Sequence, residues 1–462
     1  MMRELLPTEA DAFFEAMERN PSIAVRPNPL KNHKAVAGQP VPWSSLGYRM
    51  TERPAFTFDP LFHAGCYYVQ EPSTLFVEQA LATISSLAPK RSAPLCLDLC
   101  AAPGGKTTLL RSLIPDDALL IANEPMSQRV QVLCENVWKW GHPLTAVTQS
   151  YAEDFERLGP VFDLILVDAP CSGEGMMRKE EKAVTQWSPS LIEQCSRQQR
   201  TIVSHIWRAL KPGGFLIYST CTYNLEEDEN NVAYFRDQLG AEIRPIPIKA
   251  EWNLLGSLTS DTRLPVYRFL PHRTDSEGFF LALLRKPEEA QSPQRNIGKK
   301  KKRQHQPNNA QLSALNPQLK SWLLPGDYVS LSLGNTLYAI PASVAPTVDR
   351  LLHTVRIVSA GVPLAELKGN RLRPVHPLAL SSQFRRAAFP SVTLTYPEAL
   401  AYLRREALTL PAQTPRGHVP VTFLDVPLGF VNNLGTRANN LYPPSWSIRS
   451  AHTPDSYRPV VE

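Results

Sequence analysis

The sequence predicts an α/β protein with a doubly wound, mostly parallel central sheet, a small N-terminal cap and β-rich C-terminal modules. Between residues 95 and 286, short apolar runs alternate with segments that carry apolar residues at helical spacing, a rhythm typical of βαβ units. The run 162–170 is nearly all apolar, as expected of a strand buried on both faces. The expected strands are 95–100, 118–124, 145–150, 162–170, 215–223 and 278–286, and the clearest helices are 127–141, 189–210 and 226–239.

Three local signals complete this outline. The segment Lys211–Gly214 (KPGG) is expected to close one helix before the strand 215–223 begins. A further helix is expected from about Pro72, with Ser73 as its cap. Residues up to about 60 predict one amphipathic helix followed by an irregular section.

Changes in composition divide the 462 residues into five expected parts, because a chain of this length exceeds one ordinary core. The linker contains the basic run Lys299–Arg303, interpreted either as a solvated tether or as a tether that touches phosphates. Beyond it, short strands rich in Pro and Gly predict small β modules. The parts are a cap region (1–60), the α/β domain (61–286), the linker (287–312), a connecting module (313–384) and a final module (385–462).

The composition narrows the class of protein. A hydrophobic content of 43% and a charged content of 20% are typical of a globular chain, and no apolar run approaches the roughly 20 residues that span a bilayer. Seven cysteines, an odd number without a CxxC pair, indicate reduced thiols in a cytoplasm and no zinc site. The net charge of +6 permits an acidic partner such as RNA. We expect a cytoplasmic monomer without a metal or a membrane partner.

The stretch Leu97–Leu110 (LDLCAAPGGKTTLL) organises the chain. It reads as a strand, a tight glycine turn and the start of a helix, which places backbone N–H groups against a bound ligand. A P-loop would need glycine at position 100, which is Cys100, and GxGxxG is absent. A nucleotide-like ligand is therefore expected, rather than a triphosphate or a dinucleotide.

Two cysteines lie where parallel strands meet their following loops, in Asp168–Lys179 (DAPCSGEGMMRK) and in Tyr218–Asn230 (YSTCTYNLEEDEN). Either Cys171 or Cys221 alone would more often be a buried structural thiol. Two cysteines at two such strand ends, both facing the glycine turn, favour a role in catalysis. The remaining cysteines are interpreted as core residues, except Cys100 in the turn; they are Cys66, Cys96, Cys134 and Cys195.

These motifs together resemble the nucleolar-protein/Sun family of RNA cytosine-5 methyltransferases, which use S-adenosylmethionine. The resemblance is carried by CAAPGGKT, DAPCSGEG and LKPGG–YSTCT–EEDENNV, with FHAGCYYVQEPST just upstream. It implies a Rossmann-like methyltransferase sheet. The C-terminal half is similar to the bacterial ribosomal-RNA branch, whose members carry a small PUA-like RNA-binding module, which places that module at residues 385–462.

The resemblance assigns three catalytic roles. Carbon 5 of cytosine is a poor nucleophile until a thiolate adds to carbon 6, and the family position of that thiolate corresponds to Cys221. Asp168 corresponds to the acid that hydrogen-bonds ring nitrogen 3, which would require a protonated or shared carboxyl. Its alternative is that Asp168 only orients the loop. Cys171 corresponds to the cysteine linked to release of the product.

The cofactor site implied by the resemblance comprises the glycine turn and two carboxylates. Glu124, at the end of the second strand, suits a carboxylate that accepts bonds from both ribose hydroxyls, or it is a helix N-terminal charge. The adenine contact is left open between Tyr151 and Asp154. The expected cofactor-binding residues are Cys100, Ala101, Ala102, Pro103, Gly104, Gly105, Lys106, Glu124 and Asp168.

Several basic residues predict contacts to anions. Lys106 and Arg178 are candidates for phosphate or carboxylate contacts. Six arginines among the C-terminal turns suggest an RNA-facing surface without naming a site; they are Arg371, Arg373, Arg385, Arg386, Arg437 and Arg449. Ribosomal RNA is the expected substrate, with transfer RNA, DNA or a non-catalytic assembly role as alternatives.

Overall fold

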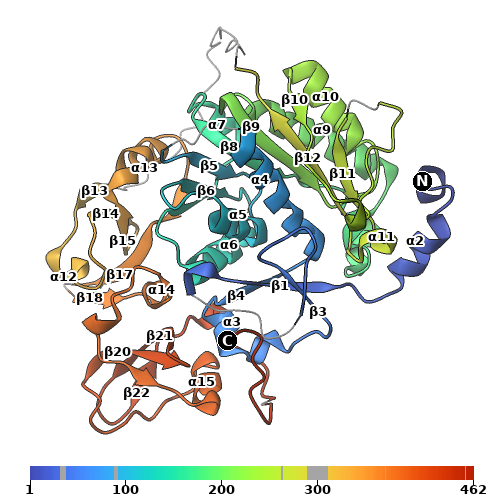
Figure 1. The fold of residues 1–462 in the computed structure, drawn as a ribbon. Helices are drawn as coiled ribbons and strands as arrows, with labels where there is room; N and C mark the ends of the chain where they lie inside the picture. Colours follow the sequence, from blue (N-terminus) through green and yellow to red (C-terminus); the bar gives the residue numbers. More distant parts are fainter. Residues whose placement is uncertain (32–37, 88–91, 262–263, 289–310, 370, 453) are drawn as a thin grey trace.

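The computed structural model describes the whole chain except residues 32–37, 88–91, 262–263, 289–310, 370 and 453. At its centre lies a nine-stranded sheet in the order β10-β12-β9-β8-β5-β6-β7-β16, with β11 paired to β12 (Figure 1). The strands β5 to β9 run parallel, and β12 lies antiparallel beside β9. The bounds are β5 Leu95–Asp98, β6 Leu119–Asn123, β7 Thr145–Thr148, β8 Phe162–Asp168, β9 Leu210–Thr220, β10 Glu242–Arg244, β11 Val266–Phe269, β12 Phe279–Arg285 and β16 Ile357–Ala360.

Helices cover both faces of this sheet because alternate strand residues point to opposite sides. Leu97 and Ile165 pack into one core with side chains from α9 and α10, whereas Cys96 and Leu164 pack into another with α4 and α5. Helix α6 covers the β6–β7 side through a third, smaller core. The helices are α4 Val77–Leu87, α5 Gly105–Leu113, α6 Ser127–Trp140, α7 Ala152–Glu156, α8 Glu181–Gln186, α9 Pro189–Ile206 and α10 Glu229–Leu239. The predicted doubly wound class is thereby confirmed.

Two local predictions are wrong. The KPGG segment lies inside β9, because the backbone of Gly213 and Gly214 pairs with Lys286, just beyond the end of β12. Helix α9 ends before this segment, at Ile206. Ser73 is not a cap: the Glu71 carboxylate accepts from the Ser73 and Thr74 N–H groups, and a 3₁₀ turn, Pro72–Phe76, precedes α4.

The N-terminal region is more regular than predicted. Helices α1 (Met2–Leu5) and α2 (Ala10–Met17) precede an antiparallel sheet in the order β2-β3-β1-β4. Strand β1 is hard to recognise in the sequence because it contains Arg26, a charged residue that is usually exposed. Here the Arg26 guanidinium is fully buried and donates to Thr108 Oγ1 at 2.6 Å and to the Gly105 carbonyl. The strands are β1 Ile23–Pro27, β2 Gln39–Pro40, β3 Tyr48–Met50 and β4 Tyr67–Gln70.

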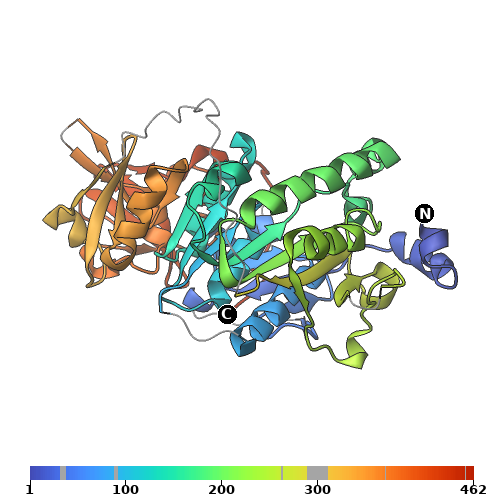
Figure 2. The same cartoon turned by 90° about the horizontal axis from the view of Figure 1, so that it is seen from above.

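The C-terminal part forms two small sheets, ordered β13-β14-β15-β17-β18 and β19-β20-β21-β22. Figure 2 shows them on the opposite side of the central sheet from α2. Strand β16 leaves the first module and pairs antiparallel with β7, so this module extends the central sheet. The basic run Lys299–Arg303 lies outside the described residues.

The C-terminal strands are β13 Leu312–Ala314, β14 Tyr328–Leu333, β15 Thr336–Pro341, β17 Val362–Lys368, β18 Arg371–Pro374, β19 Val392–Thr393, β20 Gly417–Phe423, β21 Val426–Asn433 and β22 Ala438–Asn440. The accompanying helices are α12 Pro317–Lys320, α13 Ala345–Leu352, α14 His376–Leu380 and α15 Tyr396–Leu403, and α11 (Pro271–Thr274) precedes β12. Among the residues that the structure describes, none of the helices has the length and apolar character needed to cross a bilayer.

Candidate active site

The predicted site residues gather at the carboxyl ends of β5, β8 and β9, referred to below as the strand-end site. The chain runs from β5 outward to β6 and β7, and then returns to place β8 on the other side of β5. Such a reversal of strand order opens a crevice beyond the strand ends, where ligands bind in open α/β sheets. The glycine turn follows β5 and Asp168 is the last residue of β8, the two strands at the reversal, and Cys221 follows the neighbouring strand β9.

The glycine turn Cys100–Lys106 is fixed by contacts that leave its helical end open. Arg129 donates to the Ala102 carbonyl at 2.8 Å, and Asn136 donates to the Pro103 carbonyl at 2.8 Å. Gly104 caps α5 with φ +116°, a conformation that favours glycine. The first N–H groups of α5 have no intrahelical acceptor, so they are available to a ligand.

Two buried carboxylates flank this turn, and each has an oxygen without a hydrogen-bond partner among the described residues. They are Asp98, at the end of β5, and Glu124, just after β6. Burial, with smaller effects from neighbouring charges, raises the pKa of Asp98 to about 7. Glu124 Oε2 lies 3.2 Å from Arg129 Nη1 in an ion pair.

The two oxygens Asp98 Oδ1 and Glu124 Oε2 suit a ligand that carries an amino group and sugar hydroxyls, as S-adenosylmethionine does. Asp98 was missed as a site residue in the sequence. The available signal was an acidic residue inside an otherwise apolar strand.

The structure distinguishes the two adenine candidates by exposure. The Asp154 carboxylate is buried, accepts from the Tyr151 N–H at 3.2 Å and pairs with Arg157, so it closes the first turn of α7. Tyr151 is 58% exposed. The ring of Tyr151 is therefore the better placed of the two for stacking on a base.

Cys171 and Cys221 meet, with their Sγ atoms 3.1 Å apart and both free of disulfide. The hydrogen bond to Cys221, together with burial, holds the pKa of the Cys171 thiol well above its usual range. Cys171 therefore stays protonated near pH 7 and can donate to the sulfur of Cys221. The cysteines interpreted as core, Cys66, Cys96, Cys134 and Cys195, are all buried.

Asp168 lies beside the cysteines and is held by two donors. Lys106 Nζ and Ser219 Oγ each donate to its carboxylate at 2.8 Å. Burial lowers the pKa of Lys106, but Asp168 and Cys221 outweigh this effect and the net pKa is raised. The lysine therefore remains an ammonium, and it donates to the Asp168 carboxylate. Lys106, predicted as an anion contact, pairs with a residue of the site itself.

Beneath the cysteines, two buried glutamates bind together the loops that carry them. Glu174 Oε2 accepts from the Thr222 hydroxyl at 2.5 Å and from the Tyr223 and Asn224 N–H groups at 2.7 and 3.0 Å. Glu227 accepts from the Ser172 N–H at 3.0 Å. Glu174, in the loop of Cys171, thus holds the backbone that follows Cys221, and Glu227, which follows Cys221, holds the backbone of the Cys171 loop. Sequence reasoning assigned neither residue a role, because both look like surface acids in polar runs.

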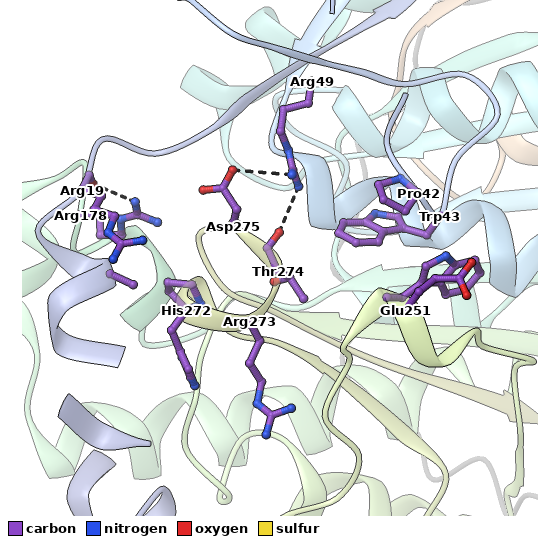
Figure 3. Close-up of a pocket in the computed structure, with 13 residues that line it drawn as sticks. Arg19, Pro42, Trp43, Arg49, Arg178, Glu251, His272, Arg273, Thr274 and Asp275 are labelled. Atoms are coloured by element: carbon purple, nitrogen blue, oxygen red, sulfur yellow. Dashed lines mark hydrogen bonds and ion pairs between the residues drawn. The ribbon is translucent and has the colours of Figure 1, made fainter. Parts of the chain in front are cut away.

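Arg178 is positioned differently from the prediction. It lines a cavity of about 320 Å³ between α2, the segment before β3, and the turn at α11 (Figure 3). Its guanidinium donates to the carbonyls of Ser276 and Arg19, and Arg49 likewise donates to Thr274 and pairs with Asp275. Arg178 joins the end of α2 to the turn before β12, and Arg49 joins β3 to the same turn, so the charges of both arginines are already engaged.

Comparison with known proteins first defines the class. A family profile described as "16S rRNA methyltransferase RsmB/F" matches residues 84–285, which include the whole strand-end site. The structure described as "Crystal Structure of PH0851" matches with a TM-score of 0.52 and 27% identity, over 62% of this chain and 64% of that one. The fold and the site therefore define a Rossmann-like methyltransferase.

The terminal regions identify the particular family. Profiles described as "N-terminal domain of 16S rRNA methyltransferase RsmF" and "Methyltransferase RsmF PUA domain" match residues 1–72 and 389–448. Ribosomal RNA small subunit methyltransferase F of Aliivibrio fischeri (strain MJ11) is 32% identical over 96% of this chain and 95% of its own. The protein of that name from Escherichia coli O6:H1 is 31% identical over 96% and 94%. The chain belongs to the ribosomal RNA small subunit methyltransferase F family, which confirms the predicted ribosomal-RNA branch.

Proposed function

We propose that this protein transfers a methyl group from S-adenosylmethionine to carbon 5 of a cytosine in 16S ribosomal RNA. The contact that carries the proposal is the 3.1 Å approach of Cys171 and Cys221 beside the Lys106–Asp168 pair. A nucleophilic thiol, a second thiol and an acid at one strand edge are the groups that addition to carbon 6 and later elimination require.

The chain offers fitting partners for the cofactor. Asp98 and Glu124 present carboxylate oxygens without hydrogen-bond partners among the described residues, and the first turn of α5 presents N–H groups. When bound, S-adenosylmethionine supplies an electrophilic methyl group. The glycine turn and the two carboxylates would hold its polar groups, while Tyr151 would cover the adenine.

Cys221 begins the reaction by bonding to carbon 6 of the cytosine, which turns carbon 5 into a nucleophile. Negative charge then builds on the ring at nitrogen 3, where Asp168 is expected to lie. Lys106 Nζ donates to Asp168 at 2.8 Å, so a proton delivered to nitrogen 3 would pass from the lysine ammonium through the Asp168 carboxyl group. Lys106 therefore joins the predicted catalytic set.

After methylation, carbon 5 loses its proton to a water molecule, the electrons of that C–H bond form the double bond between carbons 5 and 6, and the bond from carbon 6 to sulfur breaks so that Cys221 leaves as a thiolate. The proton on nitrogen 3 returns through Asp168 to Lys106. Cys171 is the neighbour of the sulfur that leaves. We assign it to this release step, in which its thiol remains protonated and faces the leaving sulfur. Its thiol hydrogen bond also stabilises the departing Cys221 thiolate.

The test is a transfer assay with labelled S-adenosylmethionine on unmodified 16S ribosomal RNA and on transfer RNA, with denaturing gels for RNA–protein adducts. Cys221→Ala is expected to lose all transfer and all adduct, whereas Cys171→Ala is expected to accumulate adduct. Cys195→Ala, a buried cysteine of α9, is the matched control and should retain activity. Methylation by Cys221→Ala would exclude this nucleophile, and methylation of transfer RNA alone would exclude the ribosomal substrate.

A further inference from the structure

A second polar concavity lies far along the chain from the strand-end site, between the two C-terminal modules. It has a volume of about 340 Å³ and is formed by the β17–β18 hairpin on one side and by the sheet β20-β21-β22 on the other. Figure 1 shows this hairpin beside that sheet. We call it the C-terminal groove, and its lining is Lys368, Arg371, Leu372, Arg373, His418, Asn432, Asn439 and Leu441.

One wall of the C-terminal groove, the β17–β18 hairpin, places several positively charged side chains next to one another. Lys368 and Arg371 are directly opposite each other in the β17–β18 register, and Arg373 follows two residues along the same face. Like charges in such a cross-strand pair destabilise a sheet. Glu366 stands opposite Arg373, but none of these three cations forms an ion pair with any described residue. This wall therefore presents cations for which the described residues supply no paired anion, and it suits an anionic partner.

The other wall is a row of neutral hydrogen-bonding groups. His418, Asn432 and Asn439 are successive neighbours across β20, β21 and β22, so their side chains line up on one face. Burial and the nearby Arg373 hold the pKa of His418 below its usual range, which leaves the ring neutral at pH 7. Within the described part of the chain these three side chains make no hydrogen bond with one another or with a neighbour.

We propose that the C-terminal groove binds the sugar–phosphate backbone of the substrate RNA. Cations facing hydroxyl-binding amides and an imidazole match phosphate oxygens that alternate with ribose hydroxyls. The lining contains no acidic side chain and no Phe, Tyr or Trp on which a base could stack. The groove therefore contributes affinity and orientation and leaves the choice of base to the strand-end site.

This proposal deepens the proposed function and rests on it for the identity of the RNA. The two can fail separately, because binding to RNA and methyl transfer are measured independently. The probe is unmodified 16S ribosomal RNA transcribed in vitro, bound to the full-length protein in filter assays between 50 and 200 mM salt.

The test variant carries Lys368→Gln, Arg371→Gln and Arg373→Gln. We expect the Kd to rise at least tenfold at low salt and the slope of log K against log salt to shrink by about two to three, since each lost phosphate contact removes about 0.7–0.9. At saturating RNA the kcat should stay unchanged, while KM rises. A variant with His418→Ala and Asn432→Ala should weaken binding with the slope unchanged, because it removes no charge.

The control carries Lys320→Gln, Arg405→Gln and Arg458→Gln, three exposed cations that lie outside the groove and outside the predicted RNA-facing arginines, with the same total charge change. Equal effects of the two triple variants on Kd and slope would overturn the proposal, as would unchanged RNA binding by the groove variant, the result expected if the groove serves an acidic protein. If the wild type fails to methylate the RNA but binding still depends on the groove cations, the methyl-transfer proposal fails and the groove stands.

Discussion

At the strand-end site, the buried carboxylate of Glu174 accepts three hydrogen bonds from the turn that carries Cys221. In the C-terminal groove, Lys368 and Arg371 face each other without an ion pair to any described residue. Around its two cysteines, the strand-end site uses its polar groups to fix its own geometry, whereas the C-terminal groove leaves its polar groups available to a ligand. Substitutions of the residues that hold the two cysteine loops should therefore affect catalysis and stability together, whereas substitutions in the groove should affect mainly the binding of RNA.

Glu174→Ala should give the largest effect. It leaves the Tyr223 and Asn224 N–H groups buried without an acceptor, and the Thr222 hydroxyl keeps only the Ser172 hydroxyl, at 3.1 Å, as a partner that can accept. Each buried donor left without an acceptor costs about 1–3 kcal/mol. We expect the free energy of unfolding to fall by about 3–5 kcal/mol and kcat to fall at least ~100-fold, because the Cys221 turn loses its position. Denaturant unfolding and single-turnover transfer measure the two quantities.

The matched control for this prediction is Glu181→Ala, since Glu181 is exposed in α8. It should change stability by less than about 0.5 kcal/mol. The affinity of Glu174→Ala for RNA should equal that of the wild type, measured where both are folded. A large loss of RNA affinity with kcat preserved would contradict the assigned positioning role.

Asp98→Asn should separate function from stability at one residue of the strand-end site. The folded pKa of Asp98, about 7, lies above the usual 3.8, so folding takes up a proton that the unfolded chain releases. The free energy of unfolding of the cofactor-free protein therefore falls as pH rises from about 4 to 7. Asn at this position removes that fall, so the variant should be more stable than the wild type at pH 8 and approach it near pH 4.

The same Asp98→Asn variant should bind S-adenosylhomocysteine at least tenfold more weakly at pH 8, because it loses the charged oxygen proposed to face the cofactor. Thermal unfolding at pH 4 and pH 8 and calorimetric titration provide the measurements. Asp116→Asn, at an exposed position before β6, is the control and should change neither. Unaltered binding by Asp98→Asn would remove Asp98 from the cofactor site.

The difference between the two regions also explains which parts of the fold and of the candidate site could be predicted from the sequence. Short motifs located the strand-end site because Cys171, Cys221 and the glycine turn each follow a strand within a few residues. Strand β16 could not be assigned in advance to the central sheet, since its pairing with β7 joins residues about 210 positions apart. Asp98 and Glu174 were missed because their importance comes from burial, which local polarity does not reveal.

The C-terminal groove illustrates the same limit. In the sequence, Arg371 and Arg373 are two of six arginines predicted to form a general basic surface, and no local pattern separates them from the other four. They become distinct only through the hairpin register, which adds Lys368, and through the facing row of His418 and Asn432. A site assembled across two modules leaves no motif in either.

Arg371→Gln alone should give the smallest effect on the folded protein, and its sign is informative. Removing one of two facing like charges should leave the free energy of unfolding unchanged or raise it by about 0.2–1 kcal/mol. Thermal unfolding without RNA measures this, with Arg449→Gln as the control for a lost exposed charge. A fall comparable to that of Glu174→Ala would mean that the hairpin cations serve folding, and the difference between the two regions would no longer hold. A neutral or positive change, combined with a smaller salt slope in RNA binding, would mean that the chain tolerates this repulsion because RNA relieves it.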